Sequence, residues 1–220
     1  MQKKRIKYFV LPAMLVCCLF FSGCSETELE ERCFPLLAAV GYEDDKVTYD
    51  VAFPKTGASS GDSNANSSVE EIKAPQVKES TFEKSKKEYE SRLNKQADYN
   101  HLKVFVIEED LLEEQKAYNQ MLDLLAESES FPRNTYVCAV DDVEELFQLE
   151  EKLSQDLGTY LEEYINKHEE GNPHILTLGD LLDEKENQTM ILYMPYLEVE
   201  KNYIEWNGYV NILGEIWQDF

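Results

Sequence analysis

Basic residues are scarce in this 220-residue sequence. It has 21 Lys and Arg against 44 Asp and Glu, which gives a formal net charge of −23. A surface this acidic repels nucleic acid and anionic lipid headgroups. The composition therefore argues against an RNA- or DNA-binding protein and against attachment to a membrane by charge.

Cysteine is also scarce beyond residue 24, where only Cys33 and Cys138 remain. Two cysteines make neither a disulfide framework nor a recognisable metal-ligand spacing. Both lie in apolar, strand-like runs, so we expect buried free thiols. A Cys33–Cys138 disulfide is the alternative.

Catalytic motifs are missing from the sequence. It contains no P-loop, no Gly-x-Gly-x-x-Gly, no Gly-x-Ser-x-Gly and no His-Glu-x-x-His. The three histidines are His101, which we expect to open a strand, His168, which we expect to end a helix, and His174, which we expect in a loop. A cation at a helix end suits the helix dipole, and a catalytic or metal-binding histidine is the weaker alternative. Nothing here indicates an enzyme, a cofactor or a metal site.

Acidic and aromatic clusters are present, and each has two interpretations. The acidic runs could suggest calcium but lack the EF-hand spacing, so we expect solvated faces and helix caps. They are Asp44–Asp45, Glu108–Glu109–Asp110, Asp141–Asp142 and Glu169–Glu170. The aromatic residues near the C-terminus could line a ligand or partner surface, but alternation in strands favours core packing. They are Tyr193, Tyr196, Tyr203, Trp206, Tyr209 and Trp217.

The sequence has no apolar run long enough for a permanent transmembrane helix. Residues 8–21 are apolar, whereas a spanning helix needs about 20 residues. The basic stretch 2–7 precedes this run, and Ser22 and Gly23 follow it. This is the layout of a signal peptide over residues 1–23.

Cys24 closes the stretch "LFFSGC", which resembles the lipobox of bacterial lipoproteins. The resemblance implies cleavage before Cys24 and acylation of its thiol by diacylglycerol with chains such as palmitate. Two acyl chains would hold the protein on the outer face of a membrane. Cys17 and Cys18 would leave with the signal peptide. An ordinary cleaved signal, or an uncleaved anchor, is the alternative.

The chain after residue 23 has the size and composition of one folded domain. It keeps 17 basic and 44 acidic residues, a net charge of −27, and the full chain is 43% hydrophobic. Strand-like segments lie at both ends, and strands alternate with helices between them. We therefore predict an α+β (mixed α/β) fold in which helices flank a mixed sheet.

The expected elements follow from periodicity and from turn and capping residues. Segments 33–41 and 47–53 form a hairpin, and a flexible loop follows near 54–79. Ser80–Glu83 and Thr159–Glu162 have the spacing of capping boxes that begin helices, and Thr177 and Asp180 open a short helix that we expect to run through Leu182. The other expected elements are strands at 101–109 and 134–140, a helix at 111–125, a helix capped by Asp141 or Asp142, and three strand-like pieces within 189–220.

In this order the segments resemble the N-terminal region of the Ger(x)C family, the lipoprotein C subunits of spore germinant receptors. The similar stretches include "ELEERCFPLLAAVGYEDDKVTYDVAFP", "NHLKVFVIEEDLL", "FPRNTYVCAV", "LGTYLEEYI" and "MPYLEVEKNYIEWNGYVNI". Ser25 stands where the family often has tryptophan, and "VGYEDD" replaces its Gly-Ile-Asp segment. The sequence ends at Phe220, where the family continues into a further domain.

The resemblance implies a non-catalytic subunit or accessory of a spore nutrient germinant receptor, anchored through Cys24 and in contact with the membrane-embedded receptor subunits. It would lie on the spore inner membrane or the cell membrane. We expect the exposed members of the C-terminal aromatic strands at the contact. The alternative is an extracytoplasmic lipoprotein that binds a small ligand or ion, with only the fold in common.

Overall fold

The computed structural model describes residues 31–55, 75–168, 176–187, 193–211 and 216–217. The chain divides into two units, Met1–Arg32 and Cys33–Phe220, and the architecture below is that of the second. The predicted signal peptide, Cys24, most of the loop expected after residue 54, Glu169–Glu170 and His174 lie outside the described residues.

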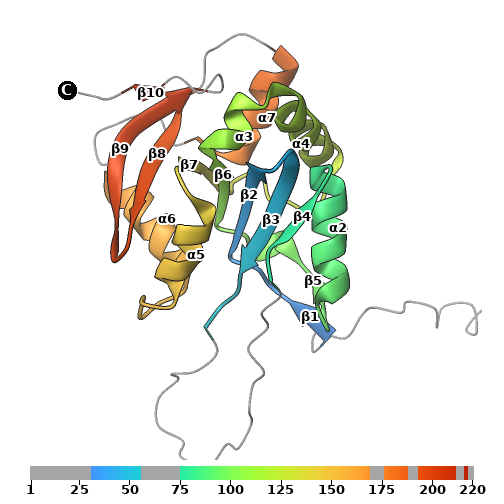
Figure 1. Ribbon diagram of the computed structural model, residues 1–220, viewed down its shortest axis with the longest axis horizontal. Helices are drawn as coiled ribbons and strands as arrows, with labels where there is room; N and C mark the ends of the chain where they lie inside the picture. The colour runs from blue at the N-terminus through green and yellow to red at the C-terminus, as the bar shows by residue number, and fades with distance from the viewer. Residues whose placement is uncertain (1–30, 56–74, 169–175, 188–192, 212–215, 218–220) are drawn as a thin grey trace, which may run out of the picture. The chain divides into compact units, whose positions relative to one another are not determined.

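An eight-stranded sheet forms the centre of the second unit in the described part of the chain (Figure 1). Its order is β10-β9-β8-β7-β6-β2-β3-β4. The bounds are β2 Leu37–Glu43, β3 Lys46–Ala52, β4 Val77–Glu79, β6 Val104–Glu108, β7 Tyr136–Val140, β8 Tyr193–Glu200, β9 Tyr203–Asn211 and β10 Ile216–Trp217. The short strands β1 (Arg32–Cys33) and β5 (Gln96–Ala97) make a separate two-stranded sheet.

The sheet is mixed, as predicted. Strands β2, β6, β7 and β8 run parallel in the middle, and antiparallel pairs complete both sides. Strand β6 shows why the middle is parallel: Val104, Phe105, Val106 and Ile107 are all fully buried. A strand covered on both faces is a continuous apolar run without alternation. The predicted α+β class is confirmed.

The predicted hairpin is also confirmed. Strands β2 and β3 pair antiparallel from Leu37 opposite Ala52 to Glu43 opposite Lys46. Asp44 and Asp45 form the two-residue turn with φ values of 52° and 60°. Left-handed backbone at both central positions is the type I′ geometry that matches strand twist, and aspartate tolerates it better than most residues do.

Helices cover both faces of the sheet (Figure 1). One apolar core packs α2 (Phe82–Arg92), α3 (Glu109–Glu113), α4 (Gln115–Glu127) and α7 (Leu178–Asn187) against one face. A second core packs α5 (Val143–Glu150) and α6 (Leu157–His168) against the other face. The connection from β7 to β8 thus places helices on both sides of the sheet.

Two of the predicted helix starts are confirmed. Thr177 and Asp180 form a reciprocal capping box before α7: the Thr177 backbone N–H donates to Asp180 Oδ2 (2.9 Å), and the Asp180 N–H donates to Thr177 Oγ1 (3.2 Å). The helix is longer than expected and ends at Asn187. Asp142, rather than Asp141, caps α5 by accepting from the Glu145 N–H at 2.8 Å.

Two other predicted starts are wrong. The cap of α2 is Thr81, whose hydroxyl accepts from the Lys84 N–H, and Ser80 lies outside the helix. The Thr159–Glu162 box does not form because α6 already begins at Leu157. Gly158 permits this earlier start: a Cβ there would lie 2.6 Å from the Leu36 carbonyl oxygen, so α6 packs closer to that segment than any side chain allows.

Three further predictions need correction. The range expected as a loop near 54–79 contains β4, which pairs with β3. The helix expected over 111–125 is two helices, with a break at Glu114. His101 ends a short 3-10 helix, η2 (Tyr99–His101), instead of opening the next strand.

Candidate functional site

The aromatic residues of β8 and β9 divide between the core and the surface. Tyr196 and Tyr209 are buried, at 3% and 8% exposure. Tyr193 and Trp206 are half-buried, whereas Tyr203 is 54% exposed, the highest value among the large hydrophobic side chains of the described residues. The side chain of Trp217 lies outside the described set. Two members of the cluster, Tyr203 and Trp206, are thus available for contact.

Trp206 continues into a stack of rings that the sequence did not predict. We call Tyr160, Tyr164, His168, Trp206 and Tyr209 the aromatic ladder. His168 lies parallel to Trp206, with ring centroids 5.5 Å apart and planes inclined by 8°, and its ring centroid is 4.2 Å from that of Tyr164. Tyr160 extends the ladder along α6, and Tyr209 meets Trp206 edge-on at 5.5 Å.

The ladder depends on how α6 and β9 are built. Residues 160, 164 and 168 are four apart, so their side chains lie one above another on the helix. In the hairpin, the register shifts between Pro195 and Leu197, and Gly208 on β9 has φ 86°. This bulge lets Trp206 and Tyr209, three residues apart on one strand, meet on the same face.

The opposite face of the β8–β9 hairpin carries acids. Glu198 lies directly opposite Glu205, and Glu200 lies directly opposite Tyr203. Like charges opposite each other in a sheet are destabilising. Neither Glu198 nor Glu205 forms an ion pair within the described part of the chain. The hairpin therefore presents aromatic rings on one face and unpaired carboxylates with Tyr203 on the other.

A second set of carboxylates lies where the parallel strands end, the usual position of ligand sites in such sheets. Here most of them hold elements together. Glu108, at the end of β6, accepts from the Tyr42 N–H (3.1 Å) and from the Val143 N–H at the start of α5 (3.0 Å). Burial is the main cause of its raised pKa. Gly41 leaves room for this carboxylate, since a Cβ at Gly41 would lie 2.1 Å from Glu108 Oε2.

The neighbouring acids also have structural partners. Glu109 accepts from the Tyr196 hydroxyl at 2.6 Å, which links α3 to β8. Asp141 accepts from the Val199 N–H at 2.8 Å, and Asp142 caps α5. The prediction of caps and solvated faces is therefore too simple for Glu108, Glu109 and Asp141, which join separate elements.

The two histidines in the described residues are packed against rings. His101 meets Phe34 edge-on at 5.2 Å. His168 ends α6 as predicted, and its Nδ1 lies 2.8 Å from the Tyr164 carbonyl oxygen. Within the described residues, no three His, Cys, Asp or Glu side chains are grouped so as to hold a metal ion.

Cys33 and Cys138 are buried free thiols, which confirms that prediction over the disulfide alternative. Burial raises the pKa of Cys33 to about 11 and that of Cys138 to about 12. Both therefore stay protonated at neutral pH and are poor nucleophiles.

A series of side-chain hydrogen bonds leads from the core to the surface, and the sequence did not predict it. The Tyr49 hydroxyl donates to the Tyr99 hydroxyl (3.0 Å), and Tyr99 donates to Glu90 Oε1 (2.9 Å). Lys86 pairs with Glu90 at 2.7 Å and lies 4.9 Å from the centroid of the Tyr99 ring. These hydrogen bonds join the β2–β3 hairpin to α2 and η2. No local periodicity predicts contacts between residues so far apart in the sequence.

Comparison with known proteins identifies one similarity. Residues 25–199 match the family model described as the spore germination protein N-terminal domain. No curated protein and no solved structure matches the chain.

Proposed function

This chain belongs to the family of spore germination proteins with this N-terminal domain, and from that premise we propose that it is a membrane-anchored, non-catalytic subunit or accessory of a nutrient germinant receptor. The observation that carries the proposal is the family match over 175 residues, 25–199, which begins directly after Cys24. Its role would be to bind the membrane-embedded receptor subunits.

A lipid on Cys24 supplies the anchor in this proposal. The basic stretch, short apolar run and "SGC" ending of residues 2–24 support it. None of the helices in the described part of the chain combines the length and apolar character needed to cross a bilayer. Two acyl chains would give the stable attachment that a protein with this net charge could not gain from anionic lipids.

The surface of the β8–β9 hairpin supports action by docking. Tyr203 and Trp206 offer large aromatic area, the residue type that dominates protein contacts. A shared membrane would raise the effective concentration of the partner, so a weak contact suffices.

Gene deletion tests the proposal. Spores without the gene should germinate more slowly, or need more nutrient, with at least one germinant, while vegetative growth is unchanged. The wild-type gene should restore germination. Normal germination with every nutrient tested, together with abundance in growing cells, would favour the ligand-binding lipoprotein instead.

The anchor is tested separately with Cys24→Ala, which should abolish labelling by a fatty-acid analogue and fail to restore germination. Cys18→Ala is the matched control, because that residue would leave with the signal peptide, and it should be labelled normally. Undiminished labelling of Cys24→Ala would refute the anchor and leave the family assignment intact.

A further inference from the structure

Over about half its length, the outer edge of β9 pairs with no strand in the described part of the chain; we call this stretch the open edge. Within the described residues, β10 pairs only with Tyr209 and Val210, and no described strand pairs with the outer edge of Tyr203–Trp206 (Figure 1). An open strand edge offers backbone N–H and C=O groups to another chain. Proteins use such edges to bind extended segments by strand addition.

The two faces beside this edge differ in chemistry. On one face lie Trp206 and its ladder neighbours His168 and Tyr164. On the other face lie exposed Tyr203 and the opposed carboxylates Glu198 and Glu205. Since side chains of a strand alternate between faces, an added strand would meet rings and acids at alternate residues.

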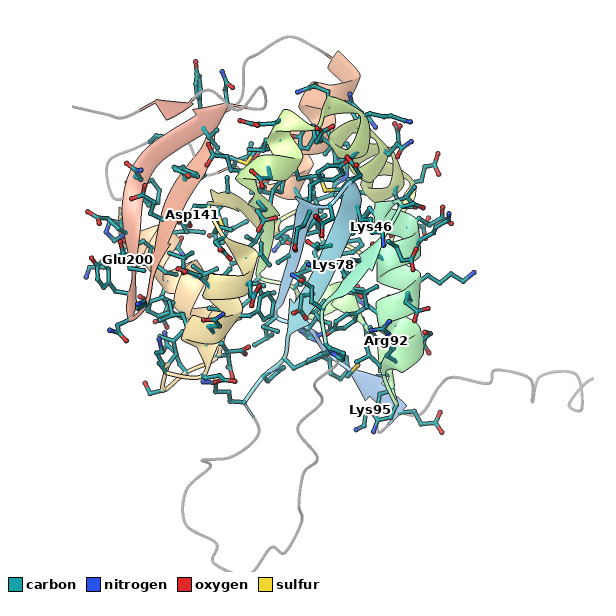
Figure 2. The ribbon with its side chains drawn as sticks, viewed as in Figure 1. Lys46, Lys78, Arg92, Lys95, Asp141 and Glu200 are labelled. Atoms are coloured by element: carbon teal, nitrogen blue, oxygen red, sulfur yellow. The ribbon has the colours of Figure 1, made fainter. Side chains whose placement is uncertain are left out.

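Charge is distributed unevenly along the sequence, and this indicates which kind of segment would bind at the open edge. Residues 32–95 hold 10 basic and 11 acidic residues, whereas residues 96–220 hold 7 basic and 29 acidic ones. Figure 2 shows Lys46 and Lys78 beside β3 and β4, and Asp141 and Glu200 on the side of β8 and β9. Strand β9 thus belongs to the acidic part of the sequence, and Glu205 on β9 and Glu198 opposite it lie beside the open edge. A basic segment would be attracted there and an acidic one repelled.

We propose that the open edge of β9, Tyr203–Trp206, binds an extended segment of a partner protein in which apolar residues alternate with Lys or Arg. The segment adds as a strand: its apolar residues pack beside Trp206 and its basic residues reach Glu198 and Glu205, with a cation over the Tyr203 ring. This rests on the proposed function, because it names the surface through which the receptor subunit docks.

A second copy of this chain fits the same edge poorly. Antiparallel pairing of two Tyr203–Trp206 edges would bring Glu205 of one copy near Glu205 of the other, with Glu198 one strand behind each, in two molecules that each carry a large negative charge. Repulsion of this kind is a recognised protection against edge-to-edge self-pairing. The same carboxylates leave the edge available to a basic partner.

Photo-crosslinking tests the inference in spore inner membranes that contain the full chain. With p-benzoylphenylalanine in place of Tyr203, irradiation should label a segment of another protein with alternating apolar and basic residues. The same group in place of exposed Lys87, on α2, should not label that segment. Adding Glu205→Lys should reduce labelling about tenfold or more, whereas Glu129→Lys, the same charge change at another exposed position, should leave it unchanged.

Glu205→Lys is informative because it should not unfold the hairpin. It replaces a like-charge pair with Glu198 by an opposite-charge pair, which favours the sheet by about 0.2–1 kcal/mol. Strand addition is read from hydrogen exchange: the backbone amides of residues 203–206 should exchange more slowly in the complex. Unchanged exchange in a complex that crosslinks would overturn strand addition.

The remaining outcomes separate this inference from the proposed function. Labelling of residues 218–220 of the same chain, of a second copy, of lipid alone or of a segment without Lys or Arg would overturn the inference. If receptor subunits co-purify with the chain but are not labelled from position 203, the inference fails and the proposed function stands. If germination is normal without the gene and the crosslinked segment still comes from another protein, the proposed function fails alone.

Discussion

At the scale of single residues, Glu108 shows how one carboxylate joins three elements. It lies at the end of β6, accepts from Tyr42 on β2, and accepts from Val143 at the start of α5. The α5 terminus carries partial positive charge, which favours a carboxylate there. Burial opposes ionisation and raises the pKa of Glu108, so the group is held against a desolvation cost.

Glu108→Gln should therefore destabilise the fold by about 1–3 kcal/mol, because the amide offers one oxygen to two backbone N–H groups and sets its NH2 group against one of them. Urea unfolding of the detergent-solubilised full chain measures this. Asp110→Asn is the control, since it removes the same charge two residues away at an exposed position, and it should change stability by less than about 0.5 kcal/mol. Equal effects of the two substitutions would contradict the bridging role.

The sequence identified Glu108 only as part of an acidic run. Glu108, Glu109 and Asp110 are adjacent, yet Glu108 joins β6 to β2 and α5, Glu109 accepts from Tyr196, and Asp110 is exposed. The partners of Glu108 and Glu109 are 35 to 87 positions away, and composition carries no information on such contacts. The aromatic ladder was not predicted for the same reason. The sequence shows the helix spacing of Tyr160, Tyr164 and His168, but it does not show that Trp206 packs beside them.

At the scale of elements, local patterns predicted the strands better than the helix starts. The hairpin β2–β3, the buried strands β6 and β7 and the paired strands β8 and β9 all follow from apolar runs and turn residues. The predicted helix start was wrong where a tertiary contact determined it, as at α6. There Gly158 lets the helix begin earlier by packing onto the Leu36 backbone.

Paired substitutions at two threonines distinguish a true cap from an apparent one. Thr177→Ala should cost about 1 kcal/mol, within the usual range of 0.5–2, because the hydroxyl accepts from the Asp180 N–H at the start of α7. Thr159→Ala should be neutral or slightly stabilising, since Thr159 lies inside α6 and alanine has the higher helix propensity. Thermal unfolding of the two variants checks the difference. A comparable loss in Thr159→Ala would show that the helix begins at Thr159 after all.

At the scale of the whole molecule, negative charge is the dominant property. The net charge is −23 for the full chain and −27 without residues 1–23. Within the β8–β9 hairpin, Glu198 and Glu205 lie directly opposite each other. A protein that needed only solubility would not require acids in direct opposition, so the arrangement favours a basic partner at this side of the sheet.

The same charge should make the fold more stable at mildly acidic pH than at pH 8. Glu108 has a raised folded pKa, so its stabilising contribution is present below its ordinary value of 4.5 and is lost as the pH rises through the folded pKa. Mutual repulsion among the surface carboxylates acts in the same direction. We therefore expect the urea midpoint to be lower at pH 8 than at pH 5.5. In thermal unfolding, each 1 kcal/mol of lost stability should lower Tm by about 2–4 °C.

Added salt at 0.5 M should reduce the part of this pH effect that is due to repulsion, because it screens exposed charges. Glu129→Lys should raise the midpoint at pH 8, and a midpoint that rises with pH at low salt would contradict the argument.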